Sequence, residues 1–310
     1  MNGPRPRSLV PQVAVVALVV VVAALVALQA AANLKARGIA SGWDYLARAA
    51  GFEIAPGFVP YSSRDTYARA LGVGVVNTLR VALAGIVAAT VLGVAVGLAR
   101  VSRLRVVSAL AAAYVEALRN TPLLLQLLFW YALTQALPGP RAALHPLPGV
   151  FLCNRGLFLP GLFGRPAFAG FDFRGGLSVT PEFGALLVCL ATYTAAFIGE
   201  IVRGGILSVG RGQTEAAAAL GLSRGQALRL VVLPQALAVI VPPTTSQYLN
   251  LAKNSSLAVA IGYPELISVT DSTLNQTGQA IEAITVAMLV YLAISLTFSL
   301  AIHLWRRERR

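Results

Sequence analysis

The sequence predicts an all-helical, polytopic membrane protein with about six spans and a short helix in an inner loop. Apolar residues make up 57% of the 310 residues, whereas Asp, Glu, Lys and Arg together make up only 12%. A soluble domain carries about 25% charged residues, so this chain has too few to cover a globule of its size. Its apolar residues also gather in long uncharged stretches, and about 20 of them suffice for a helix to cross the bilayer.

The sequence also excludes several other classes of protein. A net charge of +13 would suggest a nucleic-acid partner if the protein were soluble. Here the basic residues lie between or beside apolar stretches, which is typical of membrane topology, so we expect no nucleic-acid partner. The two cysteines and two histidines exclude the usual four-ligand zinc site. A phosphate-binding loop needs Gly before Lys, but Lys35 and Lys253 follow Leu34 and Ala252. We therefore expect no metal, nucleotide or catalytic site in this chain.

The first three spans are predicted from uncharged stretches. Residues 8–34 exceed the apolar core of a signal peptide, about 7–15 residues, which favours an uncleaved anchor over a cleaved signal peptide. The second span, residues 81–99, starts near Leu71. Small residues recur on one of its faces and let helices approach closely; they are Gly85, Ala89, Gly93 and Gly97. Residues 106–136 form the third span.

The remaining three spans follow a long outer loop. Residues 137–180 are rich in Pro, Gly and Phe and have no helical period, so we expect them outside the membrane. The last three spans are residues 181–202, 230–252 and 283–304, and the fifth should be kinked by its prolines, Pro234, Pro242 and Pro243. Only 11 uncharged residues separate Lys253 from Glu265, which predicts a re-entrant or buried short helix.

Six spans place both termini on the same side of the membrane. With the termini inside, 13 basic residues lie in short inner segments, including the basic tail 306–310, whereas nine lie across the longer outer loops 33–70 and 137–180. Basic residues are denser in cytoplasmic loops, which favours cytoplasmic termini.

The inner loop, residues 204–230, contains a short alanine-rich helix. Residues 214–220 are mostly strong helix formers, and Gly221 is expected to end the helix. A second short helix is expected over residues 224–232. A surface of small side chains suits insertion into a groove on another protein, although an ordinary amphipathic loop helix would have the same composition.

This loop resembles the E-A-A-x3-G-x9-I-x-L-P loop of the permeases of binding-protein-dependent ABC importers. The matching residues are Glu215, Ala216, Ala217, Gly221, Leu233 and Pro234, with Val231 in place of the usual Ile. Residues 76–79, 119–126, 200–206 and 250–257 are similar to the polar amino-acid permeases of the His/Glu/Gln/Arg/opine group. The extra N-terminal span and the long 137–180 loop resemble the general L-amino-acid permeases of that group.

The resemblance implies a type I transmembrane domain over residues 71–305, preceded by an anchor span and outer loop over residues 1–70. It implies four kinds of partner: a second and different permease subunit, a dimer of ATPase subunits that bind ATP and Mg²⁺, a periplasmic amino-acid-binding protein and the inner-membrane bilayer. The chain itself would bind no cofactor. The helix around Glu215–Gly221 would be the coupling helix that transmits closure of the ATPase to the spans.

Polar residues at membrane depth are candidates for the substrate path. Glu116 with Arg119, and Glu200 with Arg203, lie three apart and can pair, so a structural role is the alternative. Capping of the next helix is the alternative for the polar stretch after span five. The main candidates are Lys253, Asn254, Ser255, Ser256, Glu200 and Arg119. Lesser candidates, for which interhelical hydrogen bonds are the alternative, are Asn77, Thr78, Asn120, Thr121, Gln126 and Tyr193.

A secondary transporter driven by an ion gradient is the alternative function. Such a protein should show inverted repeats and intramembrane carboxylates. No convincing internal repeat is visible. The acidic residues that would otherwise qualify are expected in loops; they are Asp44, Glu53, Asp65, Asp172 and Asp271.

Overall fold

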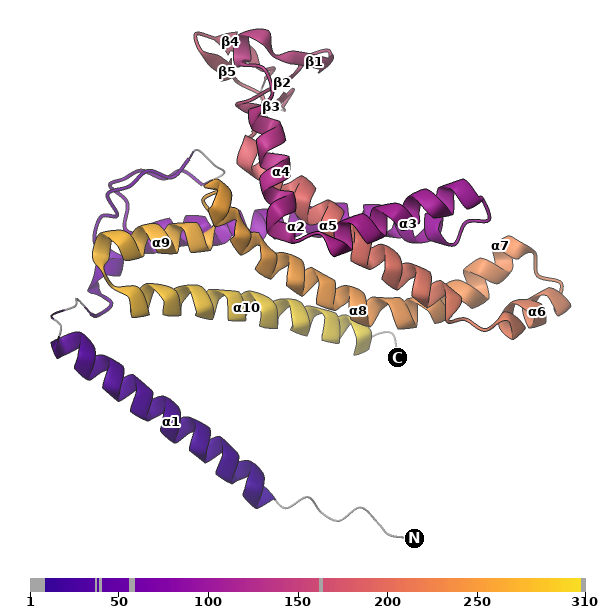
Figure 1. Cartoon of the computed structure of the whole chain (residues 1–310), viewed down its shortest axis with the longest axis horizontal. Helices are drawn as coiled ribbons and strands as arrows, with labels where there is room; N and C mark the ends of the chain where they lie inside the picture. The colour runs from indigo at the N-terminus through magenta and orange to yellow at the C-terminus, as the bar shows by residue number, and fades with distance from the viewer. Residues whose placement is uncertain (1–8, 37, 39–40, 56–58, 162–163, 308–310) are drawn as a thin grey trace.

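The computed structural model describes residues 9–36, 38, 41–55, 59–161 and 164–307. Long helices lie side by side, and a small β-sheet cap projects from near their middle, beyond the helix Leu123–Gln135 (Figure 1). The helices are α1 (Leu9–Ala36), α2 (Tyr67–Arg100), α3 (Arg105–Asn120), α4 (Leu123–Gln135), α5 (Pro181–Leu207), α6 (Arg211–Ala219), α7 (Arg224–Ala227), α8 (Leu233–Asn254), α9 (Leu266–Thr277) and α10 (Ala280–Arg307).

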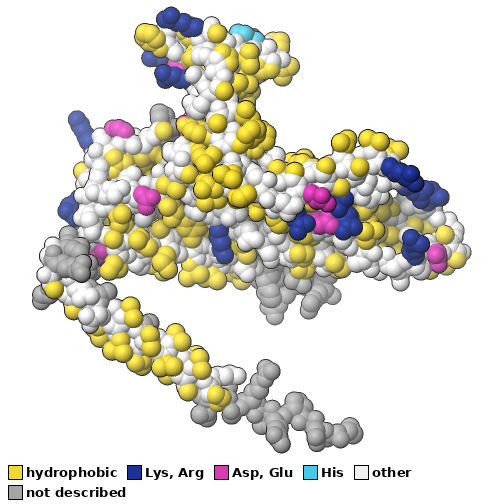
Figure 2. Space-filling model, viewed as in Figure 1, with side chains coloured by type: hydrophobic (Ala, Val, Ile, Leu, Met, Phe, Trp, Pro, Cys, Tyr) yellow, Lys and Arg dark blue, Asp and Glu magenta, His cyan; other side chains and the backbone are white. Residues whose placement is uncertain are grey.

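Within the described residues, four helical stretches are long and apolar enough to cross a membrane. They are Tyr67–Arg100, Pro181–Leu207, Arg224–Ile261 and Ala280–Leu300. The apolar stretches in α1 (Pro11–Val26) and α4 (Leu123–Gln135) are shorter. Hydrophobic side chains cover much of the helical face in Figure 2, including α4, as expected for a chain surrounded by lipid or by a partner subunit.

The prediction of a single third span over residues 106–136 was wrong. The stretch forms α3 and α4, which run in different directions in Figure 1. The break lies at Thr121 and Pro122. Proline disfavours helical backbone in the residue before it, and Thr121 is extended, with φ −103° and ψ 133°.

The second and fourth spans pack together through glycines, as the small-residue pattern predicts. A Cβ added at Gly97 would lie 2.6 Å from Val202 Cβ, and one at Gly93 would lie 2.7 Å from Ile198 Cβ. Gly199 on α5 approaches Val96 in the same way. The two backbones therefore lie as close as they do only because these positions carry no side chain.

The outer loop 137–180 forms two antiparallel sheets, which the sequence did not predict. The first has the order β1 (Leu144–Leu147), β2 (Val150–Cys153), β3 (Gly156–Leu159), β6 (Leu177–Val179). The second pairs β4 (Ala167–Ala169) with β5 (Asp172–Arg174). Phe158 and Phe173 form a small core with Cys153. Cys153 and Cys189 are both free and buried.

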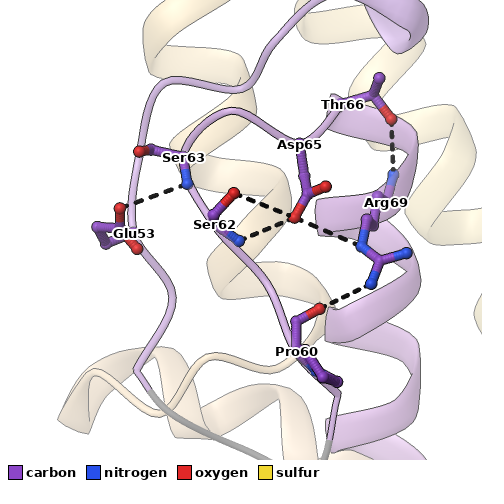
Figure 3. A network of polar contacts seen from close by, with 7 residues as sticks. All are labelled: Glu53, Pro60, Ser62, Ser63, Asp65, Thr66 and Arg69. Atoms are coloured by element: carbon purple, nitrogen blue, oxygen red, sulfur yellow. Dashed lines mark hydrogen bonds and ion pairs between the residues drawn. The ribbon is translucent and has the colours of Figure 1, made fainter.

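The outer segment that precedes α2 packs against the bundle. Asp65 accepts a hydrogen bond from the Ser62 N–H (2.8 Å) and pairs with Arg69 (3.4 Å), while Thr66 caps α2 (Figure 3). Tyr45 is fully buried in a core with residues of α2, α9 and α10. The Gly42 N–H donates to Glu282 Oε1 on α10 at 2.7 Å. This segment therefore covers the end of the bundle where α9 meets α10.

The expectation that Asp44, Asp172 and Asp271 lie in loops needs correction. The segment after Lys253 does form a short 3-10 helix, Ser255–Ile261, as predicted. It is followed by α9, which the sequence did not predict, so Asp271 lies in a helix and not in a loop. Asp44 lies in a 3-10 helix, Asp44–Ala47, and Asp172 lies in β5.

Candidate functional site

The alanine-rich helix α6 stands at the end of the bundle opposite the α9–α10 turn (Figure 1). Of its residues only Ala217 is buried, so Glu215 and Ala216 face outward. Just after it, Leu220 is 81% exposed. A short helix with an exposed apolar end is suited to contact another protein.

Gly221 ends this helix, as the sequence predicts. It adopts the left-handed conformation with φ +76°, which glycine tolerates best. The Gly221 N–H donates to the Ala218 carbonyl at 3.0 Å, and the Leu222 N–H donates to the Ala217 carbonyl at 3.1 Å. No atom lies within 4 Å of a Cβ added at Gly221, so the outer face of this turn is open.

The loop is joined firmly to the fifth span. Ser223 and Gln226 form a capping box at the start of α7. A π-helical turn, Leu228–Val232, then leads into α8 just before Pro234, whose missing N–H would otherwise interrupt a regular helix. Leu233 and Pro234 are exposed, and Gln235 Nε2 donates to Gln213 Oε1 at 3.2 Å across the two helices. The predicted motif residues therefore share one structural unit.

The polar residues after span five lie at the other end of α8. The Lys253 and Ser256 side chains line a hollow of about 350 Å³ with Ile267 and Tyr291. In the described part of the chain, the Lys253 ammonium makes no hydrogen bond or ion pair. Asn254 is the N-cap residue of the 3-10 helix but makes no side-chain capping bond. Ser255 is fully buried and donates to the Ala252 carbonyl at 2.8 Å, so neither residue caps through its side chain.

Asn77 reaches the same region from α2. Its amide Nδ2 donates to the Pro264 carbonyl at 2.8 Å, and only 5% of the residue is exposed. The next residue, Thr78, lies 3.4 Å from the Glu265 carboxylate. Asn77 therefore joins α2 to the segment after Lys253 through a buried hydrogen bond.

The candidates on the third and fourth spans form a separate group. The Glu116–Arg119 pair was a wrong prediction: among the described residues the two make no ion pair, and the Arg119 guanidinium lies over the Phe197 ring at 5.0 Å. Tyr193 contacts the same ring, with centroids 5.0 Å apart. Asn120 and Thr121 are exposed at the end of α3.

Glu200 pairs with Arg203, as the spacing predicts, through Nε at 2.7 Å. It also accepts from Arg100 Nη2 at 3.3 Å, a partner on α2 that the sequence did not suggest. These contacts tie α2 to α5 and give Glu200 a structural role.

Sequence reasoning missed a buried carboxylate beside the hollow. Glu265 is fully buried at the start of α9, where its Oε1 accepts from the Ser268 N–H at 2.9 Å. The Tyr291 hydroxyl on α10 donates to Oε2 at 2.9 Å. The sequence offers one signal for this residue, because a carboxylate such as Glu265 just before a helix can cap it. The contacts with α2 and α10 join residues far apart in the sequence, so no local sequence pattern indicates them.

Residues 83–307 match the family described as the binding-protein-dependent transport system inner membrane component. The chain belongs to this family. The chain is 41% identical to the putative amino-acid ABC transporter permease protein YhdX of Escherichia coli, over 99% of this chain and 95% of that protein. It is 40% identical to the general L-amino acid transport system permease protein AapQ of Rhizobium johnstonii, over 97% and 91%.

The solved structures support the same fold for this permease family member. One is a crystal structure of an amino acid ABC transporter with histidines, with a TM-score of 0.60 and 26% identity over 78% of this chain and 95% of that one. Another is an inward-facing methionine ABC transporter, MetNI, with a TM-score of 0.55, 20% identity and coverage of 78% and 96%. The family does not support the gradient-driven alternative.

Proposed function

We propose that the chain is the permease subunit of an ABC importer that carries polar L-amino acids across the inner membrane. The observation that carries this proposal is the exposed helix α6, ended by left-handed Gly221 and joined through α7 to a helix that continues to Ile261. It is a docking element outside the bundle, connected directly to the polar residues within it. The names of the full-length relatives support amino acids as the cargo.

In this proposal a separate subunit hydrolyses ATP with Mg²⁺ and receives α6 in a groove. Closure of the ATPase dimer then moves α6 and, with it, α8. A second and different permease subunit completes the path, and a periplasmic protein delivers the substrate to the side with the β-sheet cap and residues 41–66. The end that carries α6 lies in the cytoplasm together with both termini. The chain itself binds no cofactor and catalyses no reaction.

The substrate path in this proposal runs past the hollow at Lys253. An amino acid carries a carboxylate, and Lys253 is a cation in the described bundle without a partner of its own. Ser256 adds a hydroxyl to the same wall. Arg119, Asn120, Thr121 and Tyr193 form a second polar group that the substrate passes, whereas Asn77, Ser255 and Glu200 support the walls through the bonds described above.

Purification from the native membrane tests the proposal. The tagged chain should be isolated in mild detergent and its stoichiometric partners identified by mass spectrometry. We expect an ATPase subunit with a phosphate-binding loop and a second permease chain. The purified complex, placed in liposomes with its binding protein, should take up labelled L-glutamate or L-glutamine only with ATP. Uptake driven by an ion gradient without ATP would refute the proposal.

A further inference from the structure

We propose that Glu265 is a positioning residue for the substrate path, acting through the Tyr291 hydroxyl. Tyr291 and Lys253 together would bind the ammonium and carboxylate groups of a zwitterionic amino acid. This inference rests on the proposed function, because it assigns the recognition chemistry of the same path.

The first step is the environment of the Glu265 carboxylate. It lies fully buried where α2, α9 and α10 meet, and the groups around it are hydrogen-bond donors. Oε1 accepts from the Ser268 N–H at 2.9 Å, and Oε2 accepts from Tyr291 Oη at 2.9 Å with the Thr78 hydroxyl at 3.4 Å. Burial raises the pKa of the Glu265 carboxyl, and the hydrogen-bond donors around it act in the opposite direction. The geometry has the Tyr291 hydroxyl donating to this carboxyl.

The second step is the effect of this carboxylate on Tyr291. A phenol has one proton to donate and lone pairs that accept. Since the Tyr291 proton is directed to Glu265, the Tyr291 oxygen can serve other groups only as an acceptor. The Tyr291 side chain also lines the hollow, so in this proposal its hydroxyl oxygen, with its proton held by Glu265, is the acceptor offered to a group that enters the hollow.

The third step is the opposite chemistry of the other wall. Lys253 supplies an ammonium without a partner among the described residues, and Ser256 supplies a hydroxyl. A cation and an oriented acceptor in one hollow of about 350 Å³ match the carboxylate and ammonium of an amino acid. This volume lies near the lower limit of ligand pockets in proteins, about 300 Å³. A pocket of that size suits a substrate as small as an amino acid.

The test is direct amino-acid binding to the purified complex of permease and ATPase, without its binding protein. The probe is labelled L-glutamate, measured by equilibrium dialysis for the wild type, Tyr291→Phe, Glu265→Gln and the double variant. Glu265→Gln keeps the size of the side chain but replaces one acceptor with a donor. Tyr114→Phe is the matched control, because its hydroxyl donates to the Thr192 carbonyl at 2.7 Å, away from the hollow.

We expect each single variant to weaken L-glutamate binding about tenfold, the usual effect of losing one hydrogen bond of this kind. The double variant should bind no more weakly than Tyr291→Phe alone, because Glu265 acts through that hydroxyl. Glutarate, which has the carboxylates but no ammonium, should compete weakly, and its competition should be the same in wild type and Tyr291→Phe.

Three results would overturn the inference. One is wild-type binding by both single variants, and another is independent, additive losses in the double variant. The third is a wild-type complex that retains its ATPase and binding-protein-stimulated ATP hydrolysis but binds no L-glutamate. That last result would leave the proposed function standing, whereas a chain recovered without an ATPase would refute the proposed function itself. Recovery of the ATPase with every variant shows that each has folded.

Discussion

Replacement of Gly221 is the sharpest test of the coupling loop. At this position the backbone cost of a new residue can be distinguished from the effect of its side chain on a bound partner. A left-handed conformation costs an ordinary residue about 1–2 kcal/mol, and Asn and Asp tolerate it better than most residues. A new side chain meets no atom within 4 Å in this chain, so packing inside the subunit adds nothing. Gly221→Asn and Gly221→Asp therefore share nearly the same small backbone cost and differ in one charge.

The charge should matter only where another protein covers the turn. An unpaired carboxylate buried in an interface costs several kcal/mol, and each 1.4 kcal/mol corresponds to about tenfold in affinity. We therefore expect Gly221→Asp to weaken ATPase binding by about 100-fold or more, and Gly221→Asn to weaken it by less than about tenfold.

The assay is titration of the ATPase subunit onto the permease pair in nanodiscs, followed by binding-protein-stimulated ATP hydrolysis. Normal ATPase binding and transport by Gly221→Asp would show that the turn is not covered by a partner. Equal losses in the Asn and Asp variants would show that backbone strain, and not the buried charge, causes the defect.

Three further variants test other parts of the structure. Gly97→Leu should sharply reduce the thermal stability of the purified chain because its Cβ would meet Val202 at 2.6 Å, whereas Gly72→Leu on the same helix, with open space around it, should have little effect. Glu200→Gln should lower stability by about 1 kcal/mol by leaving two arginines without their carboxylate, with ATPase binding intact in a pull-down. Lys253→Ala should weaken L-glutamate binding by about ten- to hundredfold, the effect of losing a hydrogen bond to a charged group; unchanged binding and uptake would remove Lys253 from the substrate path.

The features that the sequence predicts correctly are those with a local pattern. The spacing of Gly93 and Gly97 predicts the close contact of α2 with a neighbouring helix, and the position of Gly221 predicts the end of α6. The break at Pro122 also had a local signal, since proline restricts the residue before it. The prediction of one span failed there because uncharged length was allowed to outweigh that signal.

The features that the sequence does not predict depend on distant residues. Glu265 contacts Thr78, 187 positions earlier, and no periodicity in either segment indicates that contact. Arg100 joins Glu200 across 100 positions in the same way. The strands of the outer cap are three or four residues long, too short for an alternating pattern to stand out, and their register depends on pairing across the loop.

The helical stretch from Arg224 to Ile261 connects the α6 loop with the hollow at Lys253. Its 38 residues, at about 1.5 Å each, would extend about 57 Å if all were α-helical. One end is held to α6 by the Gln213–Gln235 hydrogen bond, and the other carries Lys253 and Ser256. Thr244 and Thr245 donate side-chain hydrogen bonds to the Ile240 and Val241 carbonyls, one turn earlier in the same helix. A displacement of α6 by the ATPase would therefore move Lys253 and Ser256 with this helix, whereas Tyr291 on α10 would move separately from them. The distance between the two binding groups would then change with each ATPase cycle, which is the differential contact that alternating access requires.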